Sequence, residues 1–253
     1  MQWGFSMKIN FKLCILYIFL ILVVVIGCYS IYAISSAPPV TTITDVDDNE
    51  EILDLVETND EFVIPEIDYD AEELLKQNKD FKGWLYIPDT NISRPVVQGT
   101  DNAYYLNHAF TGKQSAYGCL FFDTASVEGS RNRVIYGHNM GNQRTEMFST
   151  LVEYQDQAYA ENHRYIYYAE NNTTNCYEVF AVVNFNINKI NEFDYRKANF
   201  KTEDEFNTFV SYLTERSEYA TEFSPESDLL ILSTCNGVYG RDNRLIICCG
   251  LIQ

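Results

Sequence analysis

The chain has 253 residues, of which 46% are hydrophobic and 21% charged, and these values are ordinary for a globular protein. Its formal net charge is −18, but 14 acidic residues and no Lys or Arg lie between Asp45 and Glu73, so the rest of the chain carries only about −4. Because no basic stripe is present to contact phosphates, the sequence argues against a nucleic-acid partner.

The first expected element is a membrane-spanning helix over residues 11–34. No charged side chain follows Lys12 for 22 residues, which is long enough to cross a bilayer. Lys8 and Lys12 precede the uncharged residues and acidic residues follow them, so the positive-inside rule places residues 1–10 in the cytoplasm as a short tail. A cleaved signal peptide is the alternative, although its apolar stretch is normally about 7 to 15 residues long. We expect a single-pass signal anchor in the cell membrane, with the rest of the protein outside the cell.

Residues 35–70 are predicted to form an acidic extracellular stalk. Pro38 and Pro39 end the membrane helix, and the acid-rich residues after them are too polar to form a core of their own. A catalytic domain is expected to cover residues 71–253.

From Phe81 onward, short apolar and aromatic runs alternate with turn residues, which predicts a mainly β domain with peripheral helices. Eight such runs suggest a barrel or a sandwich. The expected strands are residues 84–87, 92–97, 119–122, 134–136, 165–169, 176–185, 229–233 and 245–251. Helices are expected at residues 71–79, 145–154 and 203–216, the last behind a capping box formed by Thr202 and Glu205.

The seven cysteines contain no CxxC pair, so neither a zinc site nor a thioredoxin-like site is expected, and no metal or cofactor is predicted. Cys119, Cys176, Cys248 and Cys249 lie in strand-like runs, where Cys usually behaves as a small hydrophobe. Cys235 differs from them. It follows an apolar strand and is followed at once by Asn-Gly, which is typical of a sheet rim where reactive side chains are displayed. Cys235 is the candidate nucleophile, with a buried inert thiol as the alternative.

A thiol nucleophile needs a base, because a free Cys with a pKa near 8.5 is only a few per cent thiolate at neutral pH. His108 lies in an aromatic run and is expected to be a packed structural residue, whereas His163 lies in a polar turn and is expected at the surface. His138 follows a strand that ends in Tyr-Gly, which places it at a rim. His138 is therefore the candidate general acid and base.

A cation is the third candidate. Arg244 starts the last strand, and an antiparallel pairing with the strand before Cys235 would bring it beside the thiol. A guanidinium there could stabilise the oxyanion of a tetrahedral intermediate, since it is always charged and offers five donors. Arg241 is a rival for this role, and a solvated Arg at a strand end is the alternative.

Several motifs together resemble the class B sortases, which are cysteine transpeptidases on the surface of Gram-positive bacteria. The resemblance extends from about residue 70 to the end of the chain. The motifs are LSTC at 232–235, RLII at 244–247, YGH at 136–138, GWLYIP at 83–88, RPVVQ at 94–98, DNAYYL at 101–106 and GCLFFD at 118–123.

The resemblance implies an eight-stranded sortase-type β-barrel and a reaction in two halves. Cys235 would cleave a C-terminal sorting signal of exported proteins after a Thr, with His138 protonating the leaving amine, and a thioester would form. An amine of a peptidoglycan precursor or of a pilin subunit would then take the acyl group. Arg244 and the backbone N–H of Asn236 are implied in the oxyanion site, and Ser233 and Thr234 in substrate binding. Two alternatives are a cell-wall cysteine peptidase that only hydrolyses and a catalytically inactive surface scaffold.

Overall fold

The structure is a computed structural model, and it describes residues 64–141, 144–235 and 242–253. These residues belong to one compact unit, Glu61–Gln253. Within those ranges, no helix combines the length and the apolar character needed to cross a membrane. The predicted membrane helix at 11–34, the tail before it and most of the stalk lie outside the described residues.

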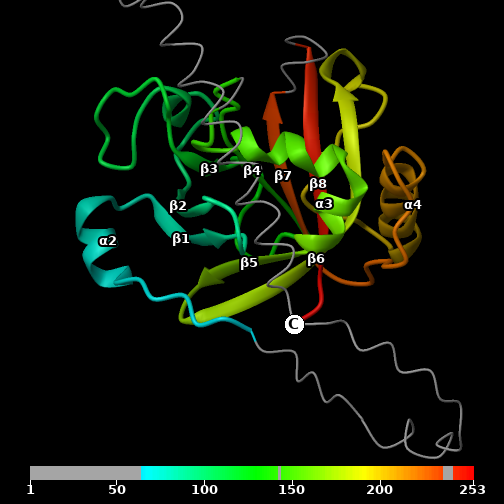
Figure 1. Cartoon of the computed structure of the whole chain (residues 1–253), viewed down its shortest axis with the longest axis horizontal. Coiled ribbons are helices and arrows are strands. Elements are labelled where there is room, and N and C mark those ends of the chain that lie inside the picture. The colour runs from blue at the N-terminus through cyan, green and yellow to red at the C-terminus, as the bar shows by residue number, and fades with distance from the viewer. Residues whose placement is uncertain (1–63, 142–143, 236–241) are drawn as a thin grey trace, which may run out of the picture. The chain divides into compact units, whose positions relative to one another are not determined.

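The unit is built on a closed β-barrel of eight strands, in the order β1-β2-β3-β4-β7-β8-β6-β5 (Figure 1). The strands are β1 (Phe81–Tyr86), β2 (Ser93–Val97), β3 (Leu120–Phe122), β4 (Asn132–Tyr136), β5 (Tyr165–Glu170), β6 (Thr173–Asn186), β7 (Leu229–Cys235) and β8 (Asn243–Leu251). Every predicted strand is present, with ends that differ by a few residues. The expected eight-stranded barrel is confirmed, and the sandwich alternative is wrong because β5 pairs with β1 and closes the sheet.

Strand β7 shows why one run of the sequence is apolar on both faces. Leu230 and Leu232 point into the barrel and join its interior cluster. Leu229 and Ile231 point outward into a second cluster beneath α4 (Glu203–Thr214). Because both faces are covered, the strand reads as continuous hydrophobic residues rather than as an alternating pattern.

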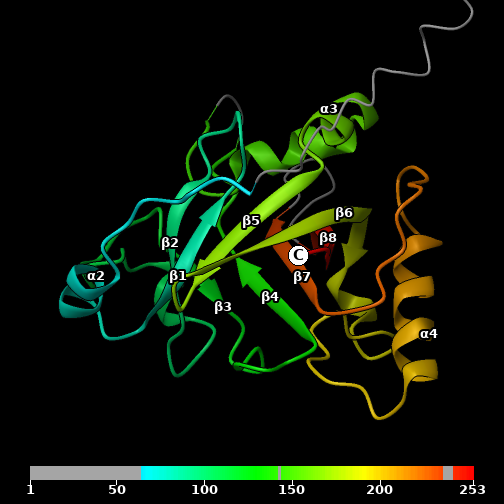
Figure 2. The same ribbon diagram turned by 90° about the horizontal axis from the view of Figure 1, so that it is seen from below.

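Helix α4 is the element that covers this outer face (Figure 2). Its N-terminus is capped as predicted, because Thr202 Oγ1 accepts a hydrogen bond from the Glu205 N–H at 3.2 Å. Phe206, Phe209 and Leu213 share the face that packs on the barrel. The helix at the other side of the barrel, α2 (Ala71–Gln77), has no buried residue.

The helix predicted over residues 145–154 is wrong in its start and its type. The structure has a 3-10 helix, η3 (Ser149–Gln155), followed by a short α3 (Gln157–Asn162) that the sequence reading missed. Met147 adopts a left-handed conformation with φ 53°, and it forms an isolated bridge with Asn139. The Phe148 N–H donates to the His138 carbonyl at 2.9 Å instead of starting a helix. Tertiary contacts with the end of β4 therefore override the local helical pattern.

Two further 3-10 turns are η2 (Tyr104–Leu106) and η4 (Ile187–Lys189).

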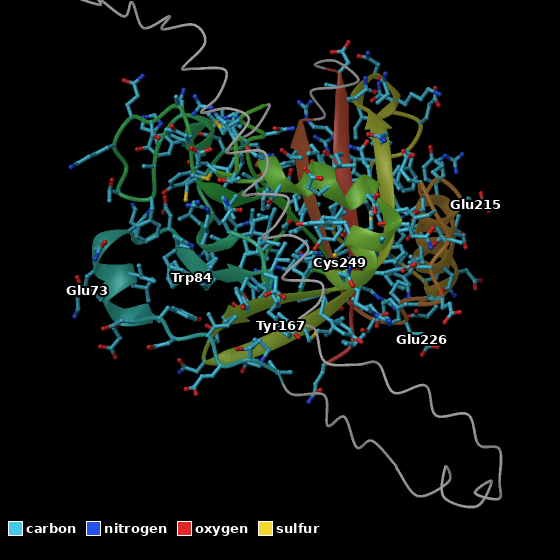
Figure 3. All side chains as sticks on the ribbon, viewed as in Figure 1. Glu73, Trp84, Tyr167, Glu215, Glu226 and Cys249 are labelled. Atoms are coloured by element: carbon cyan, nitrogen blue, oxygen red, sulfur yellow. The ribbon has the colours of Figure 1, made fainter. Side chains whose placement is uncertain are left out.

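The cysteines expected to act as small hydrophobes do so. Cys119, Cys176, Cys248 and Cys249 are buried and unpaired, and Cys249 lies among the side chains that fill the barrel (Figure 3). Burial raises the pKa of both Cys119 and Cys176 to about 12. At neutral pH these thiols are therefore protonated and unreactive.

Candidate active site

The ends of β4 and β7 bring the candidate base beside the candidate nucleophile. The two strands are parallel, with Tyr136 opposite Ser233. Beyond this pair the backbones stay joined, because the Gly137 N–H donates to the Ser233 carbonyl at 3.2 Å. Thr234 Oγ1 in turn donates to the Gly137 carbonyl at 2.7 Å. Residues 138 and 235, which follow these bonds, therefore lie at the same rim of the sheet.

Strand β8 brings the candidate cation to the same place. It runs antiparallel to β7, and the register pairs Cys235 directly with Arg244. Directly opposed residues of antiparallel strands have Cα atoms about 4.5 to 5.5 Å apart. This register is the one that the sequence reading assumed for Arg244. The side chain of Cys235 lies outside the described part of the structure, as do residues 236–241 with the predicted Asn236 and the rival Arg241.

The ring of His138 is oriented by a contact with the loop before β3. Its Nε2 lies 2.6 Å from the Leu106 carbonyl oxygen. A carbonyl oxygen can only accept, so Nε2 carries the proton and Nδ1 of the neutral ring is the basic nitrogen. The other two His side chains are engaged elsewhere: His108 stacks on Tyr104 and His163 stacks on Tyr159, both at 3.9 Å between ring centroids.

A pocket of about 400 Å³ opens at this rim, and we call it the Arg244 pocket. His138, Ser233, Thr234 and Arg244 all line it, so the structure brings four of the predicted site residues around one space. Arg244 Nη1 also donates to the Asn243 carbonyl at 3.3 Å. Apolar walls come from residues outside the predicted set, among them Leu106, Phe121, Ile187 and Ile190.

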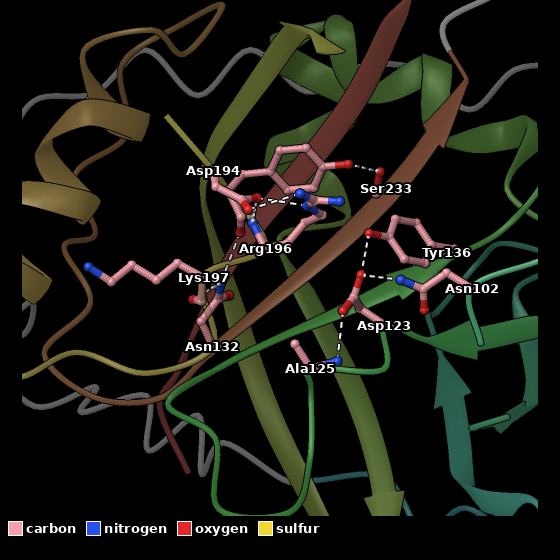
Figure 4. A network of polar contacts seen from close by, with 10 residues as sticks. Asn102, Asp123, Ala125, Asn132, Tyr136, Asp194, Arg196, Lys197 and Ser233 are labelled. Carbon is pink, nitrogen blue, oxygen red and sulfur yellow. Dashed lines mark hydrogen bonds and ion pairs between the residues drawn. The ribbon is translucent and has the colours of Figure 1, made fainter. Parts of the chain in front are cut away.

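A buried carboxylate fixes one wall of the Arg244 pocket. Asp123 is 4% exposed and accepts hydrogen bonds from the Tyr136 hydroxyl at 2.8 Å and from Asn102 Nδ2 at 2.9 Å (Figure 4). Its other oxygen accepts from the Ala125 N–H at 2.8 Å. Burial, with the nearby Asp123 charge, holds the pKa of Tyr136 well above its usual range. Tyr136 therefore remains a neutral donor at this wall.

A second set of polar groups at the Arg244 pocket is centred on Tyr195, whose hydroxyl lies 3.1 Å from Ser233 Oγ. Burial raises the pKa of Tyr195, and the Ser233 hydrogen bond and the Arg244 charge oppose that shift. Arg196, which also lines the pocket, is held by Asp194 through bonds of 2.7 and 2.9 Å, and this pairing raises its pKa. The described charged groups Asp123 and Arg196 at the pocket thus have partners within the protein.

Sequence reasoning missed Asn102, Asp123, Tyr195 and Arg196. They lie on loops and turns, where no periodicity marks a pattern. Each matters only through a contact with a residue distant in the chain, such as Tyr195 with Ser233 across 38 positions. The motif at 101–106 did contain Asn102, but nothing in the sequence paired it with Asp123.

Comparison with known proteins identifies the family of this chain. Residues 85–252 match the family model of the sortase domain. The chain belongs to the sortase family. Sortase B of Listeria monocytogenes is 31% identical over 175 residues, which cover 68% of this chain and 69% of the relative. Sortase B of Staphylococcus aureus is 27% identical over 181 residues, which cover 70% and 71%.

Solved sortase B structures share the same fold. The match to Clostridium perfringens sortase B has a TM-score of 0.67 at 24% identity and covers 73% of this chain and all of that one. A Staphylococcus aureus sortase B–substrate complex matches with a TM-score of 0.65 at 25% identity, covering 72% of this chain and 84% of that one. The resemblance to class B sortases is confirmed, and this sortase is a cysteine transpeptidase.

Proposed function

We propose that Cys235 is the nucleophile of this sortase, His138 its general acid and base, and Arg244 its oxyanion-stabilising cation. The observation that carries the assignment is the register of three adjoining strands. Strand β7 ends at Cys235, parallel β4 ends just before His138, and antiparallel β8 pairs Arg244 with Cys235. The register supports the assignment because the backbone of Cys235, the end of β4 and Arg244 share one rim, where His138 and Arg244 line one pocket.

In the first half of the reaction, the Cys235 thiolate attacks the carbonyl carbon of a Thr in the sorting signal. A carbon–sulfur bond forms, and the carbonyl electrons move to oxygen, where the Arg244 guanidinium and the Asn236 backbone N–H stabilise the charge. The intermediate then expels the amine of the next residue as the carbon–nitrogen bond breaks. Protonated His138 donates the proton that the leaving amine needs. A thioester between Cys235 and the Thr remains.

In the second half, an acceptor amine attacks the thioester carbonyl. The new carbon–nitrogen bond forms, the carbon–sulfur bond breaks, and neutral His138 accepts the proton that the amine loses. The thiolate of Cys235 returns to its starting state. The acceptor amine is assigned to a peptidoglycan precursor or to a pilin subunit, and Ser233 and Thr234 to binding of the sorting peptide.

The relatives support a substrate-binding site on this fold, because a Staphylococcus aureus sortase B of the same fold was solved as a substrate complex. The Arg244 pocket of about 400 Å³ is also large enough for a few residues of an extended peptide. Its mixture of apolar walls and partnered polar groups suits side-chain selection rather than the binding of a charged cofactor.

The assignment is tested with the full chain in detergent and a library of labelled sorting peptides, with and without an amine acceptor. We expect a thioester adduct on Cys235, detected by intact mass, and transfer of the peptide to the amine when it is present. Release of free peptide acid at equal rates with and without amine would instead identify a peptidase that only hydrolyses.

We propose also that residues 11–34 anchor the enzyme in the cell membrane, with the catalytic domain outside. The motivation is the uncharged apolar sequence preceded by Lys8 and Lys12. The acidic stalk would keep the domain at a distance from the bilayer, because its like charges repel. Fractionation of intact cells should leave the protein in the membrane and the domain open to external protease. A fully active protein in the medium, beginning near Ala37, would show a cleaved signal peptide.

A further inference from the structure

A second pocket, of about 330 Å³, shares the 104–118 segment with the Arg244 pocket, and we call it the Arg94 pocket. Residues of that segment contribute to both, Leu106 to the Arg244 pocket and Ala109 and Tyr117 to the Arg94 pocket. The walls are mainly apolar and include Pro95, Phe110 and Leu120. The proposed function leaves this pocket without an occupant.

Arg94 is the unusual group in this pocket. It lies in β2, it is partly buried, and its Nε is removed from solvent without a hydrogen-bond partner. Five other arginines of the described ranges form ion pairs with Asp or Glu, whereas Arg94 forms none there. A partly desolvated guanidinium that forms no ion pair among the described residues is costly, and an anionic ligand would lower that cost.

The second charged group in the lining of the Arg94 pocket is Glu146. Its Oε2 accepts a hydrogen bond from the Thr145 N–H at 3.2 Å, and no ion pair joins it to Arg94. The pocket thus offers a separate cation and a separate anion on apolar walls. That arrangement complements a small molecule with a carboxylate at one end and an amine at the other.

The Glu146 side of the pocket adjoins the proposed base. Met147, next in the chain, bridges to Asn139, and the Phe148 N–H donates to the His138 carbonyl at 2.9 Å. Leu120, another wall residue, packs so closely on Gly137 that a Cβ at that glycine would lie 2.5 Å from Leu120 Cδ2. An amine held near Glu146 would therefore lie toward His138, and the carboxylate toward Arg94.

We propose that the Arg94 pocket binds the amine acceptor of the second half-reaction, and that this acceptor is an amino-acid or short-peptide amine carrying a free carboxylate that Arg94 holds. The inference rests on the proposed function. Arg94 is a specificity-determining residue here, because it touches the acceptor but not the reacting atoms. The planar guanidinium suits a carboxylate, which it can engage through two parallel hydrogen bonds.

The test uses the full chain in detergent and a sorting peptide selected in the library assay. Acceptors are glycine, diglycine and triglycine, each as the free acid and as the C-terminal amide, with rates corrected for the fraction of unprotonated amine. We expect the KM of the best-fitting acid to lie about tenfold or more below that of its amide, because a charge-assisted hydrogen bond is lost in the amide. The chain length with the largest difference reports the distance between the thioester and Arg94.

Variants then assign the preference to Arg94. In Arg94→Gln the acid and the amide should differ less than about twofold in KM, and the effect should fall on the acceptor step and not on acylation. Arg94→Lys should keep part of the preference, because it keeps the charge without the planar fork. Arg216→Gln is the control, since Arg216 is an exposed arginine just after α4 whose ion pair is with Glu215. It should behave as wild type.

Three outcomes would overturn the inference. The first is equal use of acids and amides by the wild type at all three lengths. The second is an acid preference that survives in a folded Arg94→Gln. Equal loss of the preference on adding salt to Arg94→Lys and to Arg216→Gln would likewise show that general charge attraction, and not Arg94, causes it. The third is a defect of Arg94→Gln in acylation, which would assign Arg94 to the sorting peptide. A wild type that forms no thioester at all would show a different failure, that of the proposed function, and the acceptor site would fall with it.

Discussion

The Arg244 pocket and the Arg94 pocket are both lined by residues of the 104–118 segment, yet their charges are arranged differently. In the Arg244 pocket, Asp123 and Arg196 are both bound by other side chains of the protein. In the Arg94 pocket, Arg94 has no such partner among the described residues. A partnered network holds its polar groups in place and can shape a peptide site. An unpartnered guanidinium instead favours a ligand that brings its own negative charge.

The largest expected effect concerns the chemistry of the Arg244 pocket. Cys235→Ala should abolish thioester formation, because the other described cysteines are buried and the pKa of Cys119 and Cys176 is raised to about 12. Intact mass after incubation with sorting peptide measures the adduct, and circular dichroism checks the fold. Cys176→Ala, which removes a buried thiol of β6, should still form the adduct. A peptide adduct on folded Cys235→Ala would contradict the assignment.

The next effect tests the cation. Arg244→Ala should slow acylation by roughly 100- to 1,000-fold, the usual loss when one oxyanion donor is removed. Arg244→Lys should lose less than Arg244→Ala because it keeps the positive charge, but it should still lose much of the rate because it lacks the planar fork of donors. Arg241→Ala is the comparison, with an expected loss of less than about tenfold, equivalent to about 1.4 kcal/mol. Single-turnover acylation gives these rates, and a crippled Arg241→Ala beside a normal Arg244→Ala would transfer the role to Arg241.

A third substitution acts on the wall between the two pockets. A Cβ on Gly137 would lie 2.5 Å from Leu120 Cδ2 and 2.6 Å from Phe148 Cδ2. Gly137→Ala should therefore destabilise the domain by about 1 to 3 kcal/mol, the usual cost of overpacking. Urea unfolding followed by fluorescence measures the free energy. Relieving the clash would also displace His138, the next residue in the chain, so both half-reactions should slow. An unchanged unfolding midpoint would show that Leu120 and Phe148 move aside at no cost.

The smallest effect concerns the network of the Arg244 pocket. Tyr195→Phe removes a hydroxyl that lies 3.1 Å from Ser233 Oγ in a buried site. The expected loss of unfolding free energy is about 1 kcal/mol, the net contribution of one such hydrogen bond. Tyr212→Phe is the matched control, since its partly exposed ring stacks on Phe193 at 3.7 Å. Equal stability of the two variants would mean that the Tyr195 hydroxyl does not hold this wall.

The region after β4 shows the limit of reading local pattern. Residues 145–154 carry helical spacing, but the backbone at Met147 is left-handed and the helix begins only at Ser149. The hydrogen bond from Phe148 to His138 and the bridge from Met147 to Asn139 are gained instead. Helix α4 is the contrasting case. Its capping residue and its apolar face both predict the same helix, and the structure ends that helix within two residues of the predicted end.

The sequence by itself determined which segments become strands and which residues stand at their ends. Apolar runs such as Leu229 to Leu232 mark a strand buried on both faces, and Cys235 stands at the end of that strand. These are properties of neighbouring residues, so a local pattern is enough to carry them.

Only the tertiary structure decided which strand ends meet. The parallel pairing of Tyr136 with Ser233, the contact of Tyr195 with Ser233 and the lack of a hydrogen-bond partner for Arg94 Nε among the described residues all depend on residues distant in the chain. The physical reason is that barrel closure and strand register set these distances, whereas periodicity reports only which face of a segment is apolar.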